Sequence, residues 1–135
     1  MKKKKCIFLI TCLWALALFG CRSTPRVQCR YVTAVDITCD HGDTPIRRHY
    51  TDTEKMEAVL IYLRLLQPGG VPAKDPDAVD ADVYEITVSL SDGHHRVYQQ
   101  KDHRFFRNLT GGWQTVSPGH CHGLYTLMRN YESDL

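Results

Sequence analysis

The first 20 residues constrain the fold most, because they have the pattern of an export signal. If they are removed, the rest of the chain is long enough for one small domain. Four lysines, Lys2 to Lys5, precede an apolar run from Cys6 to Phe19. A basic segment followed by an apolar core this short is typical of a secretory signal and is short for a membrane span. Removing residues 1–20 from the 135 leaves 115, enough for a single hydrophobic core.

The signal ends in the tetrapeptide Leu18-Phe19-Gly20-Cys21. This tetrapeptide resembles the lipobox of bacterial lipoproteins: an aliphatic residue, a free position, a small residue and the cysteine that receives diacylglycerol. Phe19 is bulkier than most residues in the free position. The resemblance implies that Cys21 is lipidated, with palmitate among the acyl chains, and anchors the chain at the extracytoplasmic face of the cell membrane, or at the outer membrane of a diderm host. The alternatives are an ordinary cleaved signal and a membrane-anchoring helix.

We therefore expect a signal peptide at 1–20, the lipidated cysteine and a tether at 21–28, and a single domain at 29–135. The tether after Cys21, RSTPRVQ, reaches about 23 Å when fully extended, so the domain should lie close to the membrane. Without the four signal lysines, 17 basic residues fall to 13, against 15 acidic ones. A nearly neutral exported domain has no charge pattern for nucleic acid, and we expect no such partner.

Residues 29–39, CRYVTAVDITC, alternate between two faces and are rich in β-branched side chains, which predicts a strand. One face is expected to carry Cys29, Tyr31, Thr33, Val35, Ile37 and Cys39. A turn follows at Asp40 to Asp43, and a second strand is predicted from Pro45 to Tyr50. Because proline has no amide hydrogen to donate, this second strand should lie at an edge of the sheet or begin at the proline.

A helix is predicted next, because Thr51 and Glu54 have the spacing of a capping box. Its core stripe at helical spacing consists of Met56, Val59, Leu60, Leu63 and Leu66. A second apolar set lies beside the stripe and consists of Ala58, Ile61, Tyr62 and Leu65. This set indicates either a helix covered on two sides or an apolar patch for a partner. A long loop rich in proline and glycine is predicted over residues 67–81.

Two further strands are predicted from Asp82 to Leu90 and from His95 to Lys101, joined by a hairpin turn at Asp92-Gly93. The register after this turn is open, because a bulge after Gly93 would exchange Val97 and Tyr98 between the two faces. The inward residues of the first of these strands are expected to be Tyr84, Ile86, Val88 and Leu90.

A short strand is predicted over residues 103–108, and Ser117-Pro118 has the pattern of a helix N-cap and first-turn proline. The buried face of this last helix is expected to be Leu124, Leu127 and Met128 or Tyr131. The order ββαβββα predicts an α+β domain with a mostly antiparallel sheet of about five strands. Both helices should cover one face, which leaves the other open to solvent or a partner.

The last two thirds of the chain carry Tyr84-Glu85-Ile86, Asp92-Gly93, Tyr98, Phe106-Arg107 and Trp113, followed by the closing helix. This pattern resembles small uncharacterised lipoproteins of Gram-positive bacteria. The resemblance implies no activity.

Three cysteines remain outside the signal and the anchor: Cys29, Cys39 and Cys121. A continuous strand separates Cys29 from Cys39 by about 33 Å, whereas the Cα atoms of a disulfide lie within about 7 Å. Cys121 is therefore the more plausible partner, and a disulfide between Cys39 and Cys121 is the preferred pairing on the oxidising side of a membrane.

The same cysteines belong to a second hypothesis, a metal site. If the far end of the first strand meets the start of the last helix, thiols and imidazoles that suit zinc or copper converge there. The candidate ligands are Cys39, His41, His120, Cys121 and His122. The alternatives are the disulfide with solvated histidines around it, and cysteines that are unpaired or paired otherwise.

The sequence contains no G-x-S-x-G elbow and no P-loop. We therefore expect a non-enzymatic, membrane-anchored domain that binds an envelope protein or glycan through its open sheet face or its long loop. A metal-binding or redox-responsive lipoprotein is the alternative, with zinc or copper as the cofactor. A small hydrolase is a third hypothesis.

Overall fold

The computed structural model describes residues 31–40, 43–66, 71–74, 76–117 and 122–134. The predicted signal, the lipobox residues 18–21 and the tether lie outside these ranges, as do His41, His120 and Cys121. Among the described residues, no helix is both long enough and apolar enough to span a membrane.

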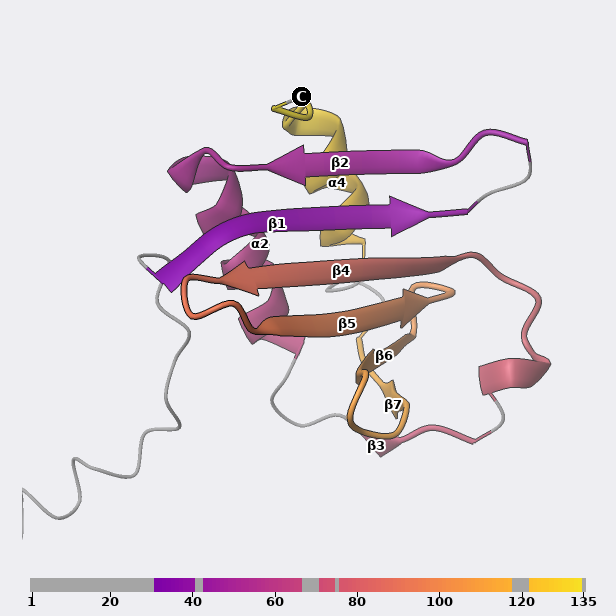
Figure 1. Ribbon diagram of the computed structural model, residues 1–135. Coiled ribbons are helices and arrows are strands. Elements are labelled where there is room, and N and C mark those ends of the chain that lie inside the picture. Colours follow the sequence, from indigo (N-terminus) through magenta and orange to yellow (C-terminus); the bar gives the residue numbers. More distant parts are fainter. Residues whose placement is uncertain (1–30, 41–42, 67–70, 75, 118–121, 135) are drawn as a thin grey trace, which may run out of the picture.

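The described residues form one antiparallel sheet with both helices on the same face (Figure 1). The strand order across the sheet is β2-β1-β4-β5-β6-β7-β3. In chain order the elements are β1 (Val32–Cys39), β2 (Ile46–Tyr50), α2 (Thr53–Leu66), β3 (Val71–Pro72), a 3-10 turn η2 (Pro76–Ala78), β4 (Val83–Leu90), β5 (His95–Lys101), β6 (Phe105–Asn108), β7 (Gln114–Thr115) and α4 (Gly123–Asn130).

The predicted α+β architecture is confirmed, with a strand count of seven in the described ranges where about five were expected. The two additional strands, β3 and β7, have two residues each and pair with one another. A two-residue strand contains no alternation that a sequence pattern can display, so these strands were not predictable by periodicity. β3 lies within the stretch that was predicted to be a loop.

The first strand alternates as predicted only in its second half. Val35, Ile37 and Cys39 face the core, but Val32 is buried and Thr33 is exposed, so the prediction that Tyr31 and Thr33 share one face with these three residues was wrong. The cause is a break in the register with β4 between Val32 and Ala34. A bulge of this kind moves the preceding residues to the opposite face.

The hairpin between β4 and β5 settles the register that the sequence left open. Gly93 has a φ of +87° and donates its amide hydrogen to Leu90 O, while the Leu90 amide donates to His94 O. A left-handed glycine that closes a three-residue loop in this way is the usual type I turn with a G1 bulge. As a result Tyr98 faces the core, with an exposed fraction of 4%, and Val97 faces outward.

The first turn of α2 is capped by a residue other than the predicted one. Asp52 Oδ1 accepts hydrogen bonds from the amides of Glu54 and Lys55, at 3.0 and 3.2 Å. The predicted capping box of Thr51 and Glu54 was therefore wrong by one residue. Aspartate caps a helix as well as threonine does, and the two lie side by side here, so the pattern alone did not separate them.

The core lies between the inner face of the sheet and the two helices. All five predicted stripe residues of α2 are buried, and so are Leu124, Leu127 and Met128 of α4. Of the second apolar set, Tyr62 is buried, whereas Ile61 and Leu65 are about half exposed. The last helix, α4, begins at Gly123, and the predicted helix start at Ser117-Pro118 stays a prediction because Pro118 lies outside the described residues. A Cβ atom on Gly123 would lie 3.3 Å from the Tyr62 ring, so glycine permits the close approach of the two helices.

Residues 131–134 form a strap that ties α4 to β2 and to the start of α2. The Asp134 amide donates to His49 O, and the Tyr50 hydroxyl donates to Tyr131 O, both at 2.8 Å. The Asp134 carboxylate accepts hydrogen bonds from the amides of Thr51 and Asp52 and from Lys55 Nζ. These donors hold the pKa of Asp134 well below its usual range, with Lys55 as the main cause.

We expect Asp134→Asn to destabilise the domain at neutral pH. A carboxyl whose folded pKa lies below its unfolded value of about 3.9 stabilises the fold fully above that value, and the contribution is lost progressively as the pH falls from there through the lower folded pKa. The thermal midpoint at pH 7 should fall by roughly 5 °C, the scale of losing one helix cap in a domain of this size. Thermal unfolding followed by circular dichroism measures the change.

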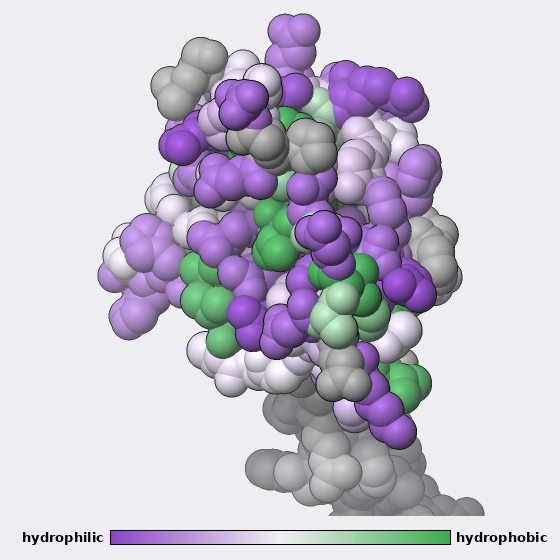
Figure 2. All heavy atoms as spheres, turned by 90° about the vertical axis from the view of Figure 1, so that its right-hand side faces the viewer, coloured by the Kyte–Doolittle hydropathy of each residue, from purple (hydrophilic) through white to green (hydrophobic). Residues whose placement is uncertain are grey.

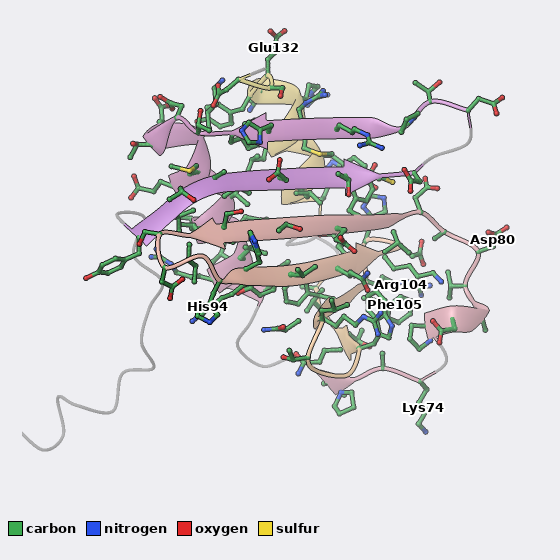
Figure 3. The ribbon with its side chains drawn as sticks, in the orientation of Figure 1. Lys74, Asp80, His94, Arg104, Phe105 and Glu132 are labelled. Atoms are coloured by element: carbon green, nitrogen blue, oxygen red, sulfur yellow. The ribbon has the colours of Figure 1, made fainter. Side chains whose placement is uncertain are left out.

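Glu132→Gln is the matched control. It also removes one negative charge, only two residues from Asp134, but the Glu132 side chain points to solvent (Figure 3). The difference between wild type and Asp134→Asn should shrink at about pH 3. Equal midpoints for the two variants at pH 7 would show that the strap does not depend on the Asp134 carboxylate.

Candidate functional site

The outer face of the sheet carries a connected row of polar and aromatic side chains that crosses strands β4, β5 and β6. Gln99 Nε2 donates to Glu85 Oε2 at 3.1 Å, and Arg107 Nε donates to Gln99 Oε1 at 2.8 Å. The Arg107 guanidinium lies over the Trp113 ring, 4.5 Å from its centroid. Register pairing places Glu85 opposite Gln99 and Gln99 opposite Arg107, so the row follows directly from the strand alignment.

The other end of the outer face carries a hydrogen-bonded pair between β1 and β2. Asp36 lies opposite His49, and the two side chains approach to 2.6 Å between Oδ1 and Nδ1. Thr87 of β4 is aligned with Asp36 on the neighbouring strand, and is partly exposed. The outer face is therefore polar from β2 to β6, and in Figure 1 no helix lies over it.

A pocket of about 450 Å³ opens where β1 ends and β4 begins. It is lined by Thr38, Asp40, Ala81, Asp82, Val83, Glu85 and Gln99. Figure 2 looks onto this end of the molecule and shows a largely hydrophilic surface with a few apolar patches. Glu85 and Gln99 belong both to the pocket and to the polar row. Three of the lining side chains are carboxylates and none is basic, so the pocket attracts positively charged groups.

Cys39 lies on the other side of the same strand end, in the core. Its exposed fraction is 2%, and it is a free cysteine in the structure. Burial raises the pKa of the Cys39 thiol above its usual value, and the Asp82 carboxylate raises it further, against a smaller opposing effect of its hydrogen bond with Tyr84. A thiol with a raised pKa is a weak nucleophile and a weak metal ligand, because the thiolate is the reactive form.

The end of β1 is linked to the start of α4 through a tyrosine of the neighbouring strand β4. Tyr84, the hydrogen-bond partner of Cys39, packs edge-on against Tyr125 with ring centroids 5.2 Å apart. Burial raises the Tyr84 pKa, and the neighbouring Tyr125 hydroxyl raises it further. Tyr125 in turn contacts the rings of His103 and His122, at centroid distances of 4.6 and 6.1 Å. The contacts that connect Cys39 with His103 and His122 thus run through two tyrosine rings.

The predicted ligand set is only partly described. Cys39 and His122 are placed, whereas His41, His120 and Cys121 lie outside the described residues, so the predicted disulfide and the five-residue cluster both stay predictions. Across the described ranges, no group of three or more His, Cys, Asp or Glu side chains is arranged to hold a metal ion. The lipobox and Cys21 also lie outside these ranges.

Two features of the site were missed by the sequence analysis. The polar row depends on Gln99, an uncharged residue in a strand whose register was open. His103 lies in the tight turn between β5 and β6, and its ring is near that of His122 at the start of α4. No spacing in the sequence connects residue 103 with residue 122. Searches for similar proteins add nothing to this geometry: no family model, no curated protein and no solved structure matches the chain.

We expect the Cys39 thiol to be protected in the folded protein. Because its side chain is 2% exposed and its pKa is raised, alkylation of Cys39 by iodoacetamide at pH 8 should be at least about a hundredfold slower than in guanidinium chloride. Peptide mass spectrometry after labelling of the full chain under reducing conditions measures each cysteine separately. Labelling of native Cys39 at the unfolded rate would contradict its placement in the core.

Proposed function

We propose that this protein is a membrane-anchored extracytoplasmic lipoprotein whose domain is a non-enzymatic binding module. The anchor is Cys21, and the ligand-binding surface is the outer face of the sheet together with the pocket at its end. The observation that carries the binding role is the outer face itself, where polar side chains from five strands stay uncovered by the helices. Solvation alone requires polar side chains on the outer face, but it does not require that they bond to one another in a row from Glu85 to Trp113.

The arrangement of the row supports binding because it is ordered before any ligand arrives. Gln99 is fixed between Glu85 and Arg107, and Arg107 is held against Trp113. Side chains that are already immobilised lose less conformational entropy when a ligand binds. Aromatic and arginine side chains are also the residue types that contribute most to protein interfaces.

The charges indicate which part of a ligand each region would accept. The pocket, with its three carboxylates, favours an amine or guanidinium group, such as those on a basic segment of an envelope protein or on an amino sugar. Arg107 and Trp113 offer a flat cationic and aromatic surface beside it. An envelope protein or a glycan with basic groups is therefore the class of ligand that we propose.

The metal-binding or redox-responsive alternative receives less support from the described part of the chain. Cys39 faces the core, its pKa is raised, and its contact with His122 is indirect, through Tyr84 and Tyr125. A redox-sensing thiol is usually exposed and has a lowered pKa. The binding module is for this reason the first choice.

We expect Cys21→Ser to abolish lipidation in a bacterial host. Serine lacks the thiol that receives diacylglycerol, so labelling with radioactive palmitate should fall to background and the precursor should keep its signal. Labelling and mobility on a denaturing gel measure both effects. Cys29→Ser is the matched control and should leave both unchanged. Palmitate incorporation that survives Cys21→Ser would reject the anchor.

We expect ligand contact through the outer face and not through the helices. A photoreactive amino acid at Thr87, in the middle of the outer face, should cross-link an envelope component in intact cells. The same amino acid at Arg64, exposed on α2, is the matched control and should give no adduct. Immunoblots after irradiation compare the two. Equal adducts at both positions, or adducts at Arg64 alone, would show that the outer face is not the binding surface.

A further inference from the structure

The turn between β5 and β6 is strained at a histidine. Asp102 and His103 have φ angles of 51° and 53°, and Arg104 N donates to Lys101 O across the turn. The register pairs Lys101 with Phe105, which leaves a three-residue loop, and left-handed positions in such turns are normally occupied by Gly, Asn or Asp. Histidine at the second position therefore costs stability that glycine would not cost, and strained backbone of this kind tends to occur at functional sites.

The His103 side chain has an unsatisfied nitrogen. Nδ1 is fully buried and has no hydrogen-bond partner among the described residues. The ring lies 4.6 Å from Tyr125, measured between centroids. Buried polar atoms are nearly always paired in proteins, and an ion is one of the few explanations for an exception.

A second imidazole lies within reach of the same ion. His122 is exposed, occupies the N-cap position of α4 and makes no side-chain capping hydrogen bond there. The centroids of the His103 and His122 rings are 6.0 Å apart. Zn²⁺ binds imidazole nitrogen at about 2.0–2.1 Å, so each ring centroid lies about 3.2 Å from the ion, and two imidazoles on one tetrahedral ion have centroids about 5.2 Å apart. The two rings would therefore have to approach by roughly 0.8 Å to share one ion, a movement for which the exposed His122 side chain has room.

We propose that His103, through Nδ1, and His122 form a binding site for a transition-metal ion that imidazole suits, with Zn²⁺ as the representative. Tyr125 packs against both rings and orients them. Water completes the coordination. This site differs from the cluster predicted around Cys39, because its first ligand comes from the β5–β6 turn and Cys39 takes no part in it. It does not depend on the lipid anchor or on ligand binding at the outer face.

The test titrates Zn²⁺ alone into the full chain, purified in detergent and stripped of metal by a chelator. Competition with a chromophoric chelator measures stoichiometry and affinity. His103→Asn removes the imidazole and keeps the turn, because asparagine tolerates a positive φ. His122→Gln removes the second imidazole from an exposed position. Each variant should weaken the binding of a single Zn²⁺ by about tenfold or more. Loss of a residue that only hydrogen-bonds to a metal ligand already costs that much affinity, and a direct ligand should cost at least as much.

His94→Gln is the control, because His94 is an exposed histidine in the β4–β5 hairpin, paired with Asp92, and should leave the affinity unchanged. The thermal midpoint of wild type should rise with Zn²⁺, and that of both variants should not. The proposal is overturned if wild type binds no Zn²⁺ at one equivalent, or if either variant binds as tightly as wild type. If circular dichroism shows that His103→Asn does not fold, His122→Gln alone decides.

Discussion

The packing of α2 and α4 against one face of the central strands β1 and β4 holds the rest of the structure in place. Val35, Ile37 and Ile86 on the sheet have no exposed surface, and neither do Val59 of α2 and Leu124 of α4. Because both helices cover the same face, the alternating strands must present their other side chains outward. The polar outer face and the pocket at its end are thus direct consequences of where the core lies.

Much of this arrangement was predictable from periodicity. β4 buries Tyr84, Ile86 and Val88 as their alternation indicated, and the stripe of α2 is buried at every predicted position. The failures occur where local geometry interrupts the period. The bulge near Val32 reverses the start of β1, and the choice between Asp52 and a neighbouring threonine as the helix cap depends on backbone angles that no spacing specifies.

In the candidate sites, too, periodicity predicted the elements, whereas the contacts between their side chains could not be predicted. The metal hypothesis was conditional on the end of β1 meeting the start of α4, and the sequence did not show that the contacts from Cys39 to His122 run through Tyr84 and Tyr125. The row from Glu85 to Trp113 could be found only after the hairpin at Gly93 had fixed which face Gln99 occupies. Contacts across strands depend on register, and a shift by one residue would have placed all of them on the other face.

The strap of residues 131–134 also has a consequence for how the domain is made. Asp134 follows its partner Asp52 by 82 residues, and every strand from β3 to β7 lies between them. The chain emerges amino end first, both from the ribosome and from an export channel, so α2 and the edge strand β2 lack these hydrogen bonds until the whole sheet has emerged. Until residues 131–134 dock, the start of α2 and β2 are exposed to proteases and to wrong pairing.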